Sequence, residues 1–193
     1  NSISVTPTVL PTTYYAEPTT TAYTNQYTNG GQKVLSNGFG TSSSGTGIST
    51  RFTTTASIRV DAIKVLPGST GTLTVVLQNS GSTTILQTFS MSVSAAQVGN
   101  FINVPVNFAI AGSGNFQLTT SGVPCSYYSS GFPVGAYSAS YMFMGGVMTI
   151  VGSSSTETGA TSTSMYGTAF DWTITTSCPS GLAARIPVVV NAN

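Results

Sequence analysis

The chain has 193 residues, of which 5 % are charged, and its formal net charge at pH 7 is +1. In soluble domains roughly a quarter of all residues are usually charged. A nearly neutral chain has no basic field that could attract nucleic acid. No apolar run reaches the roughly 18 residues that span a bilayer, so no direct membrane insertion is expected.

Polarity comes instead from hydroxyl groups, because the chain holds 28 Ser and 32 Thr. Threonine suits strands, since its branched Cβ packs well on a pleated surface. Hydrophobic residues make up 40 %, which is enough to bury a core and argues against a disordered Ser/Thr-rich stalk. This composition is typical of a secreted or cell-surface all-β protein.

Residues 1–40 differ from the rest and are predicted to form an N-terminal arm, an edge strand or a linker. Within them, Ile3 to Val9 could be an edge strand, and a group of tyrosines from Tyr14 to Tyr27 could cover a sheet edge. Residues 41–193 are predicted to form one β-sandwich module. It stays open whether residues 181–193 lead into a following domain.

Apolar and polar residues then alternate with a period of two, the pattern of half-buried strands. In Ser57 to Leu66 the apolar phase shifts near Asp61, which predicts a bulge. Pro105 lacks a donor, so its strand is expected at a sheet edge or with a bulge there. Long Gly/Ser/Thr loops are predicted at 37–50, 121–140 and 152–164. The predicted strands are Ser57 to Leu66, a hairpin over Thr72 to Ser90, Asn100 to Ile110, a return strand through Phe116 and Leu118, Met142 to Val151, Thr168 to Thr176, and Ile186 to Val190.

No helical spacing is present beyond a turn at Ser94 to Val98. Short strands separated by Gly, Ser and Asn turns predict an antiparallel β-sandwich, jelly-roll-like. Five aromatic side chains in strand phase are expected in its core: Phe101, Phe108, Phe116, Phe170 and Trp172.

Several segments in order resemble a module of large secreted Bacteroidetes proteins that use the gliding-associated, type IX export route. They are Arg51-Phe52-Thr53, Ile58 to Val65, Gly71 to Val75, Gly145 to Ser153, Phe170-Asp171-Trp172, Cys178-Pro179-Ser180 and Arg185 to Val188. The resemblance implies a β-sandwich module strung among immunoglobulin-like domains of adhesins, without transferable catalytic residues. It departs at Gly181 to Ala184, which looks inserted.

Two cysteines, Cys125 and Cys178, form an even count in a chain of extracellular composition. A disulfide between them is predicted, because oxidising compartments favour pairing. The alternative is two unpaired thiols that pack as small buried residues.

The chain has few of the side chains that catalysis or metal binding usually requires. Histidine is absent, so a Ser or Cys nucleophile lacks the usual base, and zinc lacks ligands. Asp61 and Asp171 could approach each other, or Asp171 could pair with Arg59, Lys64 or Arg185. No Asp-rich calcium loop occurs, and calcium stays open only at Asp61 or Asp171. No enzyme activity and no cofactor are expected.

Tyrosines crowd the long segment from 121 to 140 and just beyond it. Tyr127, Tyr128, Tyr137 and Tyr141 lie there among Ser and Gly, with Phe132. Such loops often bind ligands, since tyrosine offers contact area at low entropic cost. The alternative is a loop that folds back on its own rings.

Two function hypotheses remain. The first is a non-enzymatic adhesive or structural module of a bacterial cell-surface or secreted protein, which contacts neighbouring modules of the same protein. The alternative is a carbohydrate-binding module that recognises neutral glycans through the four tyrosines, because a nearly neutral chain offers little attraction for charged ligands.

Overall fold

A computed structural model describes residues 12–16, 24–30, 41–130, 143–144, 146–177 and 186–190, with side chains described within 44–130 and 146–176. The chain forms two compact units. One comprises Asn1–Thr24 with Ser177–Asn193, and the other Asn25–Thr176. The boundary predicted after residue 40 stays a prediction. The larger unit takes in most of β2 (Thr24–Gly30), which pairs with β14 (Phe170–Ser177).

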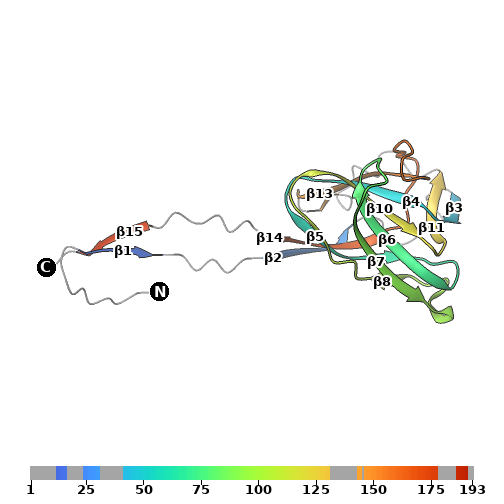
Figure 1. Cartoon of the computed structure of the whole chain (residues 1–193), viewed down its shortest axis with the longest axis horizontal. Coiled ribbons are helices and arrows are strands. Elements are labelled where there is room, and N and C mark those ends of the chain that lie inside the picture. The colour runs from blue at the N-terminus through green and yellow to red at the C-terminus, as the bar shows by residue number, and fades with distance from the viewer. Residues whose placement is uncertain are drawn as a thin grey trace. The chain divides into compact units, whose positions relative to one another are not determined.

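The larger unit is built from antiparallel sheets (Figure 1). A six-stranded sheet has the order β12 (Phe143–Met144), β13 (Met148–Ser154), β4 (Ile48–Thr54), β10 (Gly114–Ser121), β6 (Gly71–Asn79) and β7 (Ile85–Val93). A five-stranded sheet contains β2, β14, β5 (Ile58–Val65) and β8 (Ile102–Val104), with β9 (Phe108–Ile110) also paired to β5. A two-stranded sheet joins β11 (Cys125–Ser130) and β3 (Thr41–Gly45). The predicted all-β antiparallel sandwich is confirmed.

Apolar side chains from the two larger sheets meet in one core. Phe52 on β4 and Trp172 on β14 lie with ring centroids 5.3 Å apart, edge to face. The Trp172 indole N–H donates to the carbonyl of Ala169 at 2.9 Å, so its polar atom is satisfied inside the core. Phe108, Phe170 and Trp172 are buried as predicted, while Phe101 and Phe116 are partly buried against the core.

The bulge predicted in β5 is present. Both apolar phases of this strand are buried, with Ile58 and Val60 in one and Ile63 and Val65 in the other. The pairing with β14 changes register opposite this point, because Thr173 lies opposite Ala62 and Ile174 opposite Val60.

The neighbouring strand is interrupted as Pro105 predicts. It divides into β8 and β9, both on the same edge of β5. Asn107 between them has a φ of 51°, and its N–H donates to the carbonyl of Asp61 at 3.1 Å. The interruption keeps Ile102, Val104, Val106, Phe108 and Ile110 buried on one face.

Two predicted loops contain strands, and that prediction was wrong. The segment 37–50 includes β3 and the start of β4, and the segment 121–140 includes β11. Apolar alternation is missing there, because β3 is Ser- and Gly-rich and β4 begins with buried hydroxyls such as Ser49 and Thr50. The weak helical signal at Ser94 to Val98 is a single 3-10 turn, Ala95–Gln97.

In the smaller unit, β1 (Thr12–Ala16) pairs antiparallel with β15 (Ile186–Val190), from Thr12 opposite Val190 to Ala16 opposite Ile186. The strand predicted at 186–190 is therefore confirmed. The strand suggested at Ile3 to Val9 lies outside the described residues. A search of the described residues finds no helix that is both long and apolar enough to cross a membrane.

Candidate functional site

The tyrosine-rich segment begins on β11. Tyr128 is 1 % exposed, and its backbone exchanges two hydrogen bonds with Tyr166, at 2.9 and 3.1 Å. Because the Tyr128 ring is buried, a sugar cannot stack on it. Tyr127 is half-buried, beside Gly45 of β3, where an added Cβ would lie 3.4 Å from a ring carbon. Phe132, Tyr137 and Tyr141 lie outside the described residues.

The two aspartates proposed for calcium each have a cation of their own. Asp61 accepts from Arg59 Nε at 2.5 Å and from the Thr175 hydroxyl at 2.5 Å. Asp171 pairs with Lys64 at 2.6 Å, one of the three partners that the sequence suggested. Across the side chains that the structure describes, no three His, Cys, Asp or Glu residues gather into a metal-binding group.

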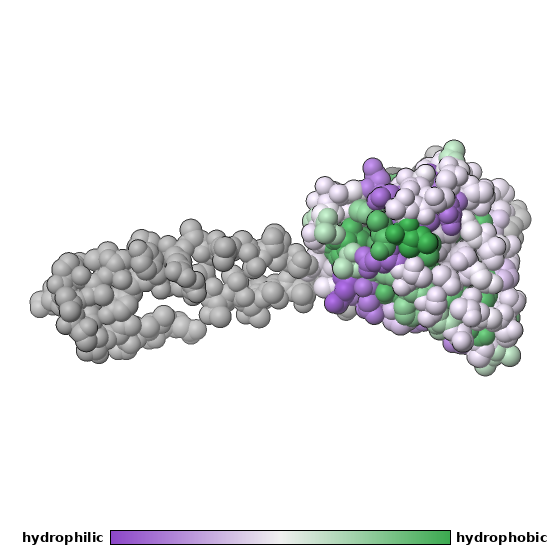
Figure 2. All heavy atoms as spheres, viewed as in Figure 1, coloured by the Kyte–Doolittle hydropathy of each residue, from purple (hydrophilic) through white to green (hydrophobic). Residues whose placement is uncertain are grey.

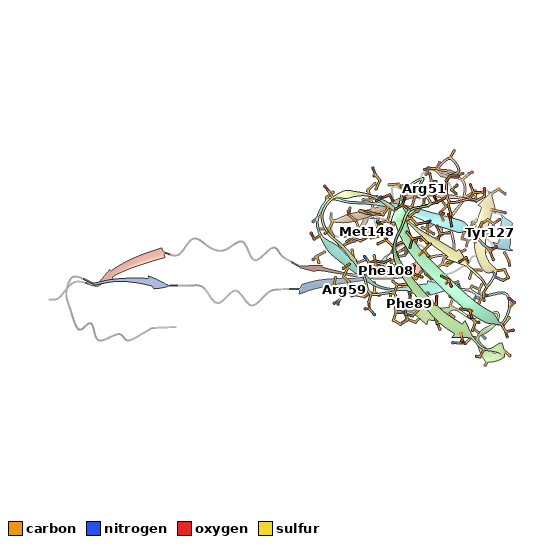
Figure 3. The ribbon with its side chains drawn as sticks, viewed as in Figure 1. Arg51, Arg59, Phe89, Phe108, Tyr127 and Met148 are labelled. Atoms are coloured by element: carbon orange, nitrogen blue, oxygen red, sulfur yellow. The ribbon has the colours of Figure 1, made fainter. Side chains whose placement is uncertain are left out.

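The Arg59–Asp61 pair lies away from Tyr127 of the tyrosine-rich segment. Arg59 and Tyr127 are at opposite ends of the folded unit in Figure 3. A single site that combined Asp61 with Tyr127 is therefore excluded. The Lys64–Asp171 pair lies nearer to β11, because the N–H of Ser126 donates to the carbonyl of Leu66 at 2.9 Å.

The predicted disulfide is not formed at Cys125, so this prediction is corrected. Cys125 is a free, fully buried thiol at the start of β11. Its sulfur lies 3.6 Å from the carbonyl of Val123, and burial raises its pKa to about 12, against a smaller opposing effect of Thr120. Cys178 lies outside the described residues. Cys125 fits the alternative of a small core residue.

A buried polar network on the outer face of the six-stranded sheet was missed by the sequence analysis. Ser49 and Arg51 of β4 and Gln117 and Thr119 of β10 point away from the apolar core, yet all four are buried. Alternating polar residues predict a solvent-facing side of a strand, so no signal in the pattern marks them as buried.

The segment 155–161 covers this network. Gln117 donates to Gln78 Oε1 at 3.1 Å and to the carbonyl of Glu157 at 3.0 Å. The Thr119 hydroxyl donates to Gln78 Oε1 at 2.8 Å. Buried amides and hydroxyls are costly without partners. The two bonds to Gln78 satisfy side chains within the sheet, and the bond from Gln117 to Glu157 joins the covering segment to the sheet.

Arg51 forms the strongest part of this attachment. Its guanidinium donates to the Thr161 hydroxyl at 2.7 Å, to the carbonyl of Gly159 at 2.5 Å and to the carbonyl of Glu157 at 3.2 Å. Desolvation by burial lowers the pKa of Arg51, and its Nε has no partner. The contacts mark Arg51 as a clamp on the covering segment.

The edge strand β7 presents the opposite arrangement. Ile85 and Leu86 are 56 % and 43 % exposed and are the exposed large hydrophobic residues of the described side chains. Figure 2 shows hydrophobic residues gathered in one area of the visible face, beside a group of hydrophilic ones. Exposed apolar residues that cluster on a surface often mark a contact site.

Comparisons with protein-family models, curated proteins and solved structures found no significant match. The resemblance to secreted Bacteroidetes modules therefore stays a prediction from the sequence.

Proposed function

We propose that the chain is a non-enzymatic adhesive or structural module of a secreted or cell-surface bacterial protein, which acts through contacts with other protein surfaces. The observation that carries the proposal is strand β7, a nine-residue sheet edge without a charged residue and with Ile85 and Leu86 exposed. Such edges are usually blunted by charges, prolines or covering loops. An edge left open is suited to contact.

The internal use of charge supports the same function. Arg59 pairs with Asp61, Lys64 pairs with Asp171, and Arg51 is buried under the segment 155–161. The described surface thus carries few charged groups, among them Arg59 and Lys64 in their ion pairs, and consists mainly of hydroxyls, amides and exposed apolar groups. Contacts of this kind are weak one at a time and gain avidity when a surface repeats the module.

Surface display tests this function. Bacterial cells that display the chain are expected to be retained on a solid surface under flow, or to clump, more than cells that display an unrelated β-sandwich at equal density. Equal retention and equal clumping of the two strains would overturn the proposal.

A carbohydrate-binding module is the second candidate, favoured by the half-buried ring of Tyr127 beside Gly45. One ring in water gives weak stacking, so binding of a neutral glycan with a Kd on the order of 0.1–1 mM is expected. A glycan array followed by Tyr127→Ser tests it, with Tyr128 left intact because its ring is buried. Retention of no neutral glycan by the wild type would reject this candidate.

A further inference from the structure

We propose that β7 pairs edge to edge with β7 of a second copy of this chain, antiparallel and around a two-fold axis. The six-stranded sheet of one copy would then continue into that of the other. This pairing rests on the proposed function, in that it names the partner of the contact surface.

The backbone of β7 is open on its outer side. Its eight paired residues face β6, from Val93 opposite Gly71 to Ile85 opposite Gln78. Within the described chain, the strand order ends at β7, and no backbone hydrogen bond joins it to a strand other than β6. An edge strand with free N–H and C=O groups is a template for another strand.

The nearest edge of the other sheet is already closed. The Gln87 side chain accepts from the backbone N–H of Ala109 on β9 at 3.1 Å and donates to its carbonyl at 2.5 Å. Gln87 thus caps β9 and leaves the β7 backbone free. The open edge therefore has no partner of this kind among the described strands, and a strand of another chain can supply one.

The chemistry of β7 favours a copy of itself. Its sequence, ILQTFSMSV, has no charge and no proline, so self-pairing brings no like charges together and loses no donor. A two-fold axis lets both copies make the same contacts. With the axis at Phe89, the strand midpoint, Thr88 lies opposite Ser90 of the second copy.

The same register accounts for the exposed apolar residues. It places Ile85 opposite Val93 of the second copy and Leu86 opposite Ser92. Ile85 and Leu86, which are the exposed large hydrophobics of the described side chains, would then be covered at both ends of the paired strands. Thr88 and Ser90 are exposed and would lie at the centre.

Sedimentation of the full chain over a concentration series tests the pairing. Edge pairing of one strand buries little area, so a weak dimer with a Kd of about 1 mM or tighter is expected. A chain that sediments as a monomer at about 1 mM would overturn the proposal.

Charge exchange at the centre tests the register. A Thr88→Lys/Ser90→Lys variant places like charges opposite each other, and so does Thr88→Glu/Ser90→Glu. Each variant is expected to be monomeric, whereas an equimolar mixture should form a one-to-one dimer. As the matched control, Ser57→Lys/Asn115→Lys adds equal charge at exposed positions outside β7 and should dimerise like the wild type.

Unchanged thermal unfolding shows that each charged variant is folded. Dimers of the Lys variant alone and of the Glu variant alone, or no association in their mixture, would refute this register. A chain that dimerises in solution but fails to retain displayed cells would overturn the proposed function alone. A monomeric chain that still retains them would overturn the β7 pairing alone.

Discussion

The centre and the edge of the six-stranded sheet differ in an unexpected direction. On the outer face of the central strands, Arg51, Gln117 and Thr119 are buried. At the edge, Ile85 and Leu86 on β7 are exposed. Polar side chains are covered and apolar ones are not, so coverage by the chain decides burial here more than side-chain polarity does.

The difference teaches where each region gains its stability. At the centre, hydroxyl, amide and guanidinium groups bond to the segment 155–161, and their partners offset desolvation. At the edge no covering segment exists in the described chain. The outer face of the central strands is covered by the chain itself, whereas the β7 edge is suited to contact with another molecule.

The apolar core between the sheets sets the scale for both regions. Trp172→Ala should lower the free energy of unfolding by about 3–5 kcal/mol, because it empties a fully buried site against Phe52. Urea denaturation measures this, with Ile85→Ala on β7 as the control that should change little. Similar losses in the two variants would mean that the edge is packed like the core.

Arg51→Ala should be the largest change at the outer face, with a loss of about 2–3 kcal/mol. It removes the donors to Glu157, Gly159 and Thr161 and should also admit proteases to the covering segment. Arg59→Ala is the matched control, since Arg59 is exposed and its ion pair should contribute at most about 1 kcal/mol. Equal losses in the two variants would contradict the role of Arg51 as a clamp.

Gln87→Ala should cost about 1 kcal/mol, because it removes both hydrogen bonds to Ala109. It also opens the β9 edge, so the variant should associate more readily than the wild type at high concentration. Thr88→Ala, at an exposed neighbour, serves as the control in urea denaturation and sedimentation. Unchanged stability and association would show that the cap is not needed.

Ionisation of the Cys125 thiol should have the smallest effect on the free energy of unfolding at neutral pH. Burial raises its folded pKa to about 12, above the ordinary thiol pKa of 9.0, so the folded state holds this proton more tightly. The corresponding stability is fully present below about pH 9 and is lost as the pH rises toward 12. In a Cys178→Ser background, iodoacetamide at pH 8 should label Cys125 only after denaturation.

The same reagent checks the absence of a disulfide at Cys125. Unreduced, denatured wild type should take up two alkyl groups, whereas a chain that takes up none would restore the original prediction. Rapid labelling of folded Cys178→Ser protein would contradict the burial of Cys125.

The strands that could be predicted are those with apolar alternation. Ile102 to Ile110 is buried at every second residue, and the phase shift in β5 places a bulge where the structure has one. β3 and β11 were not predicted, because the Ser, Gly and Tyr residues that pair across these two strands show no apolar alternation. A strand can be predicted from alternation only where one of its faces packs against the apolar core.

The candidate surfaces could be predicted only in part. Composition suggested ring platforms, yet Tyr128 is buried, and its backbone pairs with that of Tyr166, a long-range contact that no local pattern reports. The burial of Arg51 depends on a segment more than a hundred residues away. The exposed edge at Ile85 depends on strand order, which sequence spacing does not determine.

Amide hydrogen exchange of β7, followed residue by residue in dilute and concentrated samples, tests the central claim most directly. Amides of β7 that do not bond to β6 should exchange fast in dilute solution and measurably more slowly in concentrated solution, in proportion to the fraction of dimer. Those of β4 and β10, which pair on both sides, should be protected equally in both. Equal exchange of the β7 amides at the two concentrations would contradict a contact at this edge.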